Sequence, residues 1–153
     1  MVRRTALTRR AALLVLAGAA IPAEWSAARP DRVVLIVGTA SPVTGLDVID
    51  IRRIFLGIPV SQGGVTLHAL RNESDPALQE VFLQNVVSMS TSAYQRRLLA
   101  LVLEQGRQTP PAYTDLRQLL AVLATDAGAV SYAWESTVAR HPRIRVLRVL
   151  WEG

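Results

Sequence analysis

The chain has 153 residues, half of them apolar and none of them cysteine. This length and apolar fraction suit one folded domain and exclude an intrinsically disordered chain. The absence of cysteine excludes disulfides, thiolate zinc sites and cysteine nucleophiles. All 17 basic residues are arginine, and the formal net charge is +5. That charge would suit a nucleic-acid-binding protein only if it lay on the folded part of the chain.

The first 28 residues have the pattern of a secretory signal peptide. Four arginines precede an apolar run over 11–23. As a helix this run would span about 20 Å, which is short of the roughly 30 Å of a bilayer core. We therefore expect cleavage after Ala28, export to the periplasm or beyond, and no stable membrane span in the mature protein. An uncleaved anchor helix is the alternative.

Arg9 and Arg10 follow Thr8 and precede leucines, as in a twin-arginine signal, so twin-arginine and ordinary secretory export are both open. Residues 29–153, the predicted single domain, keep 13 arginines against 11 acidic residues, a net charge of +2. Most of the basic excess belongs to the targeting segment. The sequence therefore does not predict nucleic-acid binding.

The domain begins with a β-branched run over 33–37, which predicts a strand buried on both faces. After a loop, Thr44 and Asp47 have the spacing of a capping box and predict a helix that ends at Gly57. Val65–Leu70 follows a Gly-Gly turn and predicts a second strand. The apolar stripe of the helix comprises Val48, Ile51, Ile54 and Phe55.

Asp75 and Pro76 predict the N-cap and the first residue of another helix. A longer helix is predicted over 91–105, with Gly106 ending it. A further helix is predicted after Thr114, which is a candidate N-cap. The apolar positions of these three helices are Leu78, Val81, Phe82 and Val86, then Tyr94, Leu98, Leu101 and Val102, then Leu116, Leu119, Leu120 and Leu123.

Two strands complete the domain, at 129–132 and 144–150. The last carries Arg145 and Arg148, as expected of an edge strand whose charges discourage aggregation. Strands that alternate with helices predict an α/β three-layer sandwich with a mixed or mostly parallel sheet.

Three segments in this order resemble the phosphate-binding proteins of the high-affinity phosphate ABC transporter, especially a group of short, single-lobe relatives. Residues 51–57 read Ile-Arg-Arg-Ile-Phe-Leu-Gly, 106–111 read Gly-Arg-Gln-Thr-Pro-Pro, and 127–132 read Ala-Gly-Ala-Val-Ser-Tyr. The family has similar motifs at a helix end, a linker and a strand. The resemblance implies one lobe of a type II periplasmic binding protein.

The resemblance also implies a function. The family segment that opens the helix after the second strand has the form Arg-x-x-Gly-Ser-Gly-Thr, and 71–76 here read Arg-Asn-Glu-Ser-Asp-Pro. It implies that Arg71 and Ser74, with Ser41 after the first strand, bind phosphate or a similar small oxyanion. The protein would then act with an ABC transport system, and a homodimer is one way to supply the missing second lobe.

A second hypothesis comes from the departure at Asp75 and Pro76. A carboxylate here repels an anion, and proline removes an N–H donor. This favours an interaction or sensory module that has lost ligand binding and docks to an envelope protein.

Enzymatic and metal-dependent functions have no motif in this sequence. No nucleophile elbow, phosphate loop or dinucleotide-binding glycine pattern occurs, so we expect no catalytic residue and no cofactor. His68 and His141 are far apart and lack the spacing of metal ligands, so we expect no metal site. Trp134 and Trp151 are expected to serve packing or an interface.

Overall fold

The structure is a computed structural model that describes residues 31–153, so the predicted signal peptide at 1–28 lies outside the described residues. The helices and strands are, in chain order, β1 (Arg32–Gly38), α1 (Val48–Phe55), β2 (Val60–Gln62), β3 (Val65–Ala69), β4 (Arg71–Asn72), α2 (Pro76–Phe82), the π-helical turn η1 (Leu83–Val87), α3 (Thr91–Gln105), β5 (Ala112–Tyr113), α4 (Leu116–Thr125), β6 (Ala129–Trp134), α5 (Glu135–Val138) and β7 (Ile144–Glu152).

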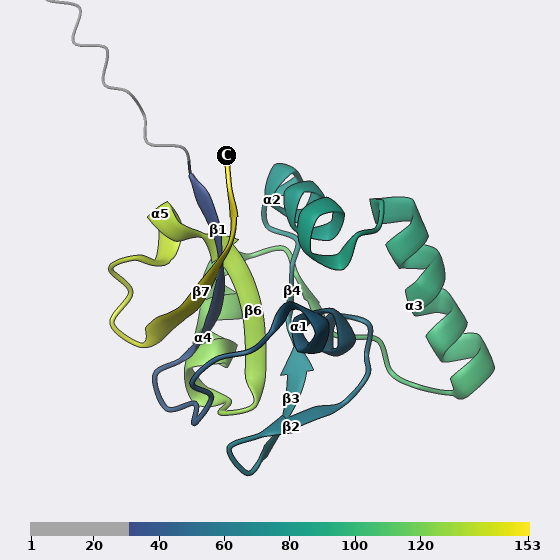
Figure 1. The fold of residues 1–153 in the computed structure, drawn as a ribbon, viewed down its shortest axis with the longest axis horizontal. Coiled ribbons are helices and arrows are strands. Elements are labelled where there is room, and N and C mark those ends of the chain that lie inside the picture. Colours follow the sequence, from purple (N-terminus) through teal and green to yellow (C-terminus); the bar gives the residue numbers. More distant parts are fainter. Residues whose placement is uncertain (1–30) are drawn as a thin grey trace, which may run out of the picture.

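Five strands form a mixed sheet in the order β2-β3-β6-β1-β7 (Figure 1). β3 and β6 are parallel, with Ala69 opposite Val130. β1 is antiparallel to both of its neighbours, β6 and β7. β4 and β5 pair separately, in parallel. The α/β prediction with a mixed sheet is confirmed.

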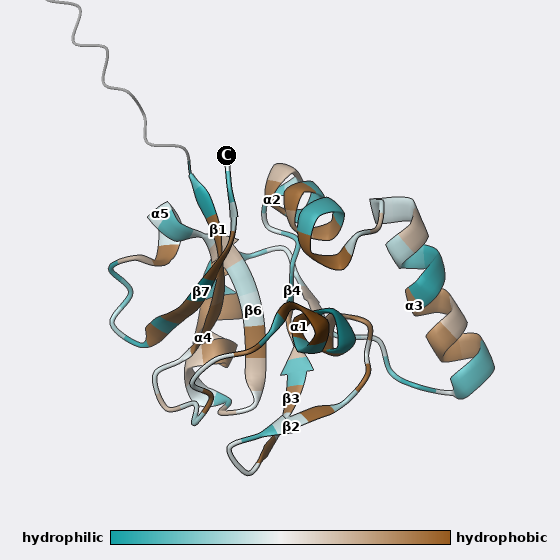
Figure 2. Ribbon diagram, in the orientation of Figure 1, coloured by the Kyte–Doolittle hydropathy of each residue, from teal (hydrophilic) through white to brown (hydrophobic). Residues whose placement is uncertain are grey.

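Helices cover both faces of the sheet. The apolar residues at successive positions of β1 match this arrangement, since both faces of that strand are buried. Val33, Leu35 and Val37 belong to the core that includes α1, α2, η1 and α3. Val34 and Ile36 belong to the core on the other face, with α4 and α5. Figure 2 shows the matching apolar colour over most of β1. The predicted three-layer sandwich is thus confirmed.

Two helices begin later than the sequence predicted. α1 is capped by Asp47, whose Oδ1 accepts a hydrogen bond from the Asp50 N–H at 2.7 Å, and not by Thr44. α4 is capped by Asp115, which accepts from the Arg117 N–H at 2.8 Å, and not by Thr114. In both places aspartate lies nearer to the apolar stripe than threonine, and its carboxylate is a favourable partner for helix N–H groups.

The helix α3 has the predicted bounds, from the Ser90 cap to Gly106, whose φ of 59° is the left-handed conformation typical of a helix end. Leu98 and Leu101 are buried as predicted, but Val102 is exposed. Val102 lies one residue beyond the buried stripe, on the side that faces solvent.

Two local features of the fold were not predicted from the sequence. β2 forms a hairpin with β3 through Gly63 and Gly64, both at positive φ. The helix that starts at Pro76 continues into η1 and ends at Ser88, whose φ is 63°. The predicted apolar positions Leu78, Phe82 and Val86 are nevertheless buried.

The edge strand β7 also holds the loop that follows β1. Arg145 Nη2 donates to the carbonyls of Ser41, at 3.0 Å, and Val43, at 2.6 Å. Arg148 Nη1 donates to the Leu46 carbonyl at 2.9 Å. These arginines therefore satisfy loop carbonyls in addition to lining an edge.

Candidate functional site

The direction of the strands separates the predicted binding residues. β1 and β3 both adjoin β6, but β3 is parallel to it and β1 is antiparallel. β1 and β3 therefore run in opposite directions, and their carboxyl ends lie at opposite ends of the strands. Ser41, Arg71 and Ser74, which follow these two strands, were predicted to form one site, but the structure does not bring all three together.

Ser41 lies beyond the end of β1, beside the turn that precedes β6. Its hydroxyl donates to the Ala127 carbonyl at 2.8 Å and accepts from the Val43 N–H at 3.4 Å. Asn72, at the other end, contacts the Tyr132 carbonyl. Along β6 the two contact points are roughly 15 Å apart. Ser41 is buried, and its hydrogen bonds fasten the loop.

Arg71 and Ser74, by contrast, lie in one polar network around the start of α2. Arg71 Nε donates to the Pro110 carbonyl, and Nη1 donates to Glu73 Oε1, each at 2.8 Å. The side chain of Arg71 is only 16% exposed. The charge of Arg71 is therefore already paired with the carboxylate of Glu73, and the ion pair is partly shielded from solvent.

Asn72 is the residue of this network that the sequence analysis missed. It is fully buried, and its Oδ1 accepts from both the backbone N–H of Ser74, at 3.1 Å, and the hydroxyl of Ser74, at 2.6 Å. Its Nδ2 donates to the Tyr132 carbonyl at 2.9 Å, and the Tyr132 hydroxyl donates to the Asn72 carbonyl at 2.9 Å. An asparagine two residues before a serine was the available signal, because it is typical of a side-chain-closed turn.

Asp75 occupies the N-terminus of α2, as predicted. Its Oδ1 accepts from the N–H groups of Ala77, at 2.9 Å, and Leu78, at 3.3 Å. Its Oδ2 accepts from Trp134 Nε1 at 2.8 Å. The helix N–H groups that would attract an anion are thus satisfied by a carboxylate of the chain itself.

These contacts predict how stability depends on pH. The hydrogen bond from Trp134, together with those from the α2 backbone, holds the pKa of Asp75 below its ordinary value of 3.8, although partial burial opposes the shift. A carboxylate with a lowered pKa stabilises the fold above its unfolded-state pKa, and this contribution is lost as the pH falls through the folded-state pKa.

We therefore expect the free energy of unfolding of wild type to fall more steeply than that of Asp75→Asn as the pH falls below about 4. Asparagine is an equally good N-cap but does not titrate. Urea denaturation at several pH values measures the difference. Parallel pH profiles for the two proteins would contradict this assignment.

The described residues also bear on metals and membranes. Among residues 31–153, no three histidine, aspartate or glutamate side chains are grouped so as to hold a metal ion. His68 Nε2 lies 2.9 Å from Asp126 Oδ2, a pair at the protein surface. In the same part of the chain, no helix has both the length and the apolar character that crossing a bilayer requires.

The comparisons with known proteins concern the fold. No family model and no curated protein matches the chain. A solved structure of a possible phosphate binding protein from Planctomyces limnophilus has a TM-score of 0.54 and 13% identity, over 82% of this chain and 46% of that one. An ABC-type phosphate transport receptor from Vibrio cholerae has a TM-score of 0.48 and 12% identity, over 78% of this chain and 46% of that one.

The chain therefore spans about half the length of these solved structures. The resemblance to phosphate ABC transporter substrate-binding proteins, predicted from three sequence segments, is confirmed for the fold. The chain has the fold of one lobe of a periplasmic binding protein.

Proposed function

We propose that the protein is a non-enzymatic interaction module of the cell envelope, built on a solute-binding fold and acting without a bound oxyanion. The observation that carries the proposal is the Asp75 carboxylate, which accepts hydrogen bonds from two N–H groups of α2 and from Trp134. An incoming phosphate would have to displace this carboxylate or approach it, and like charges repel at short range.

The state of Arg71 supports the same proposal. Its guanidinium is paired with Glu73, so binding of a second anion would require the first ion pair to open. Ser74 donates its hydroxyl to Asn72 and shares no cluster with Ser41. Export to the periplasm, an envelope partner and the absence of catalysis belong to the proposal.

The competing proposal is phosphate capture with an ABC transport system. The fold similarity to the possible phosphate binding protein supports it. Phosphate would then bind to Arg71 and Ser74 near the start of α2. Ser41 could contribute only from a second copy of the chain, or after a rearrangement of the fold. An isolated lobe leaves such a site open to water, where each ion pair gains only about 1 kcal/mol.

Calorimetric titration of the purified protein with inorganic phosphate separates the two proposals. We expect no binding heat at millimolar phosphate, and the same result for Arg71→Ala. Arg117→Ala, at an exposed arginine on α4, is the matched control. Binding by wild type and by Arg117→Ala that is lost in Arg71→Ala would establish the receptor function instead.

An envelope extract provides the positive test of the module. We expect a stoichiometric partner to be retained by the wild-type protein in phosphate-free buffer. Retention that depends on added phosphate would count against the module.

A further inference from the structure

Helix α3 buries one face in the core and exposes the other. Leu98 and Leu101 are buried, and the hydroxyl of Tyr94 donates to the Phe55 carbonyl at 2.6 Å. Figure 1 shows α3 at the periphery of the fold. Residues two positions apart on a helix point in nearly opposite directions. Leu103 therefore points away from the core side of the helix, and it is 75% exposed.

The exposed face of α3 is apolar over the second half of the helix. Leu99, Val102 and Leu103 are three and four residues apart, so their side chains form one patch, the α3 outer face. Figure 2 shows the apolar colour of this half of the helix. Single exposed apolar residues are ordinary on a protein surface, whereas a contiguous patch marks an interaction surface.

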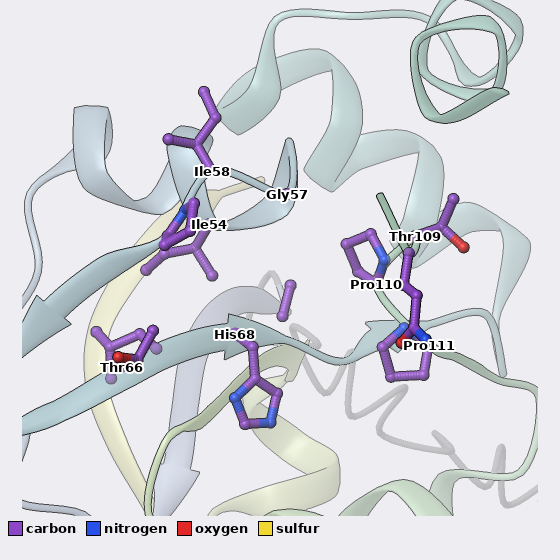
Figure 3. Close-up of a pocket in the computed structure, with 12 residues that line it drawn as sticks. Ile54, Gly57, Ile58, Thr66, His68, Thr109, Pro110 and Pro111 are labelled. Atoms are coloured by element: carbon purple, nitrogen blue, oxygen red, sulfur yellow. The ribbon is translucent and has the colours of Figure 1, made fainter. Parts of the chain in front are cut away.

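This patch is separate from the cavity of about 340 Å³ beside β3. Figure 3 shows Gly57 and Ile58 at one side of that cavity and Thr109 and Pro110 at the other, and among the described residues none from α3 lines it. Arg107 Nη1 donates to the Gly57 carbonyl at 3.3 Å and so fastens the segment after α3 to the end of α1. The α3 outer face therefore keeps a fixed position relative to the rest of the fold.

Charged residues of opposite sign lie toward the two ends of this face. Arg96 and Arg97 come before Leu99, and Glu104 comes directly after Leu103. In the part of the chain that the structure describes, none of these three charged side chains forms an ion pair. The last turn of α3 also has no basic residue to offset the partial negative charge of its free carbonyls. The face is thus positive toward its amino end and negative toward its carboxyl end.

We propose that the α3 outer face binds the same face of a second copy of this chain, with the two helices antiparallel. Around a two-fold axis, each contact between two residues occurs twice. When Leu99 lies opposite Leu103 of the second copy, Leu103 also lies opposite Leu99 of that copy. Arg96 then lies beside the carboxyl end of the other α3 and its Glu104, a favourable position for a positive charge.

The distribution of charge favours this occupant and this orientation. In a parallel pair, the arginines of the two copies would face one another and repel. In an antiparallel pair, each positive end meets a negative end, so the surface is complementary to itself. The inference goes beyond the proposed interaction function, because the hydrogen bonds of Asp75 involve no residue of this face.

The length of α3 limits the strength of the contact. Its 15 residues span about 22 Å. A single pair of helices of this length buries less than the roughly 1,200 Å² at which specific, stable interfaces begin. We therefore expect a weak dimer, with a dissociation constant of roughly 10–100 µM.

Sedimentation equilibrium of the purified protein, from about 10 µM to about 1 mM, tests the association. We expect the weight-average mass to rise from that of a monomer toward that of a dimer. Leu103→Glu should weaken the association at least about tenfold, because it places a charge in the apolar contact. Ile49→Glu is the matched control, at a 63% exposed position on α1, and should associate like wild type. A monomeric wild type, or equal association by the two variants, would overturn the proposal.

Exchanging the charges tests the antiparallel orientation. Arg96→Glu and Glu104→Arg should each weaken self-association about threefold, because each change makes both charged pairs of the dimer repulsive. An equimolar mixture of the two variants should associate more tightly than either alone, since both pairs then join opposite charges again. A mixture that associates no more tightly than its components would overturn this orientation. Phosphate titration does not involve α3, so failure here would leave the proposed function standing.

Discussion

Replacing Gly38 with alanine is expected to lower the free energy of unfolding by about 3 kcal/mol, since a side chain here overpacks a closed core. Gly38 ends β1, which lies between β6 and β7 in the sheet, and α4 packs against it. A Cβ atom at this position would lie 2.3 Å from the carbonyl oxygen of Leu123 and 3.3 Å from the Cα of Ala124. Both atoms belong to the backbone, so no side-chain rotation relieves the overlap, and α4 or β1 must shift.

Urea denaturation followed by circular dichroism measures this loss. Gly45→Ala is the matched control, because a Cβ there meets no atom within 4 Å. We expect that variant to stay within about 0.5 kcal/mol of wild type. If the two alanine variants proved equally stable, the close packing of α4 against β1 would be wrong.

Phe82→Ala is expected to cost about 3–5 kcal/mol of stability. Phe82 is fully buried, and its ring stacks on Tyr132 with centroids 3.7 Å apart and planes within 3°. Its ring also meets Phe55 edge to face at 4.7 Å. Truncation removes both aromatic contacts and leaves a cavity where α1, α2 and β6 meet.

Thermal and urea unfolding of Phe82→Ala should show this loss directly. Leu103→Ala provides the comparison, since Leu103 is 75% exposed on α3 and should tolerate truncation within about 0.5 kcal/mol. A loss below about 1 kcal/mol for Phe82→Ala would mean that the aromatic cluster is not packed as described.

The sequence predicted those elements whose signals are local. The apolar run of β1 could be identified because both of its faces are buried. The end of α3 followed from Gly106, which the structure places at positive φ. The cap at Asp75 followed from aspartate before proline, and its hydrogen bonds confirm it. Each of these signals lies within a few residues of the structure it determines.

The direction in which β1 runs relative to β3 could not be predicted in this way. A strand buried on both faces has the same residue pattern whether its neighbour is parallel or antiparallel. Here the direction depends on pairing with β6 and β7, about a hundred residues away in the sequence. Ser41 was therefore predicted to lie beside Arg71, whereas the two residues lie at opposite ends of β6.

The ends of β1 and β7 have a mechanical consequence. Arg32 pairs with Glu152 in the sheet, and their side chains form an ion pair at 3.3 Å. Figure 1 shows β1 and β7 side by side, with the C-terminus at the end of β7. Polypeptide attached at both ends would leave from one corner as two neighbouring tethers.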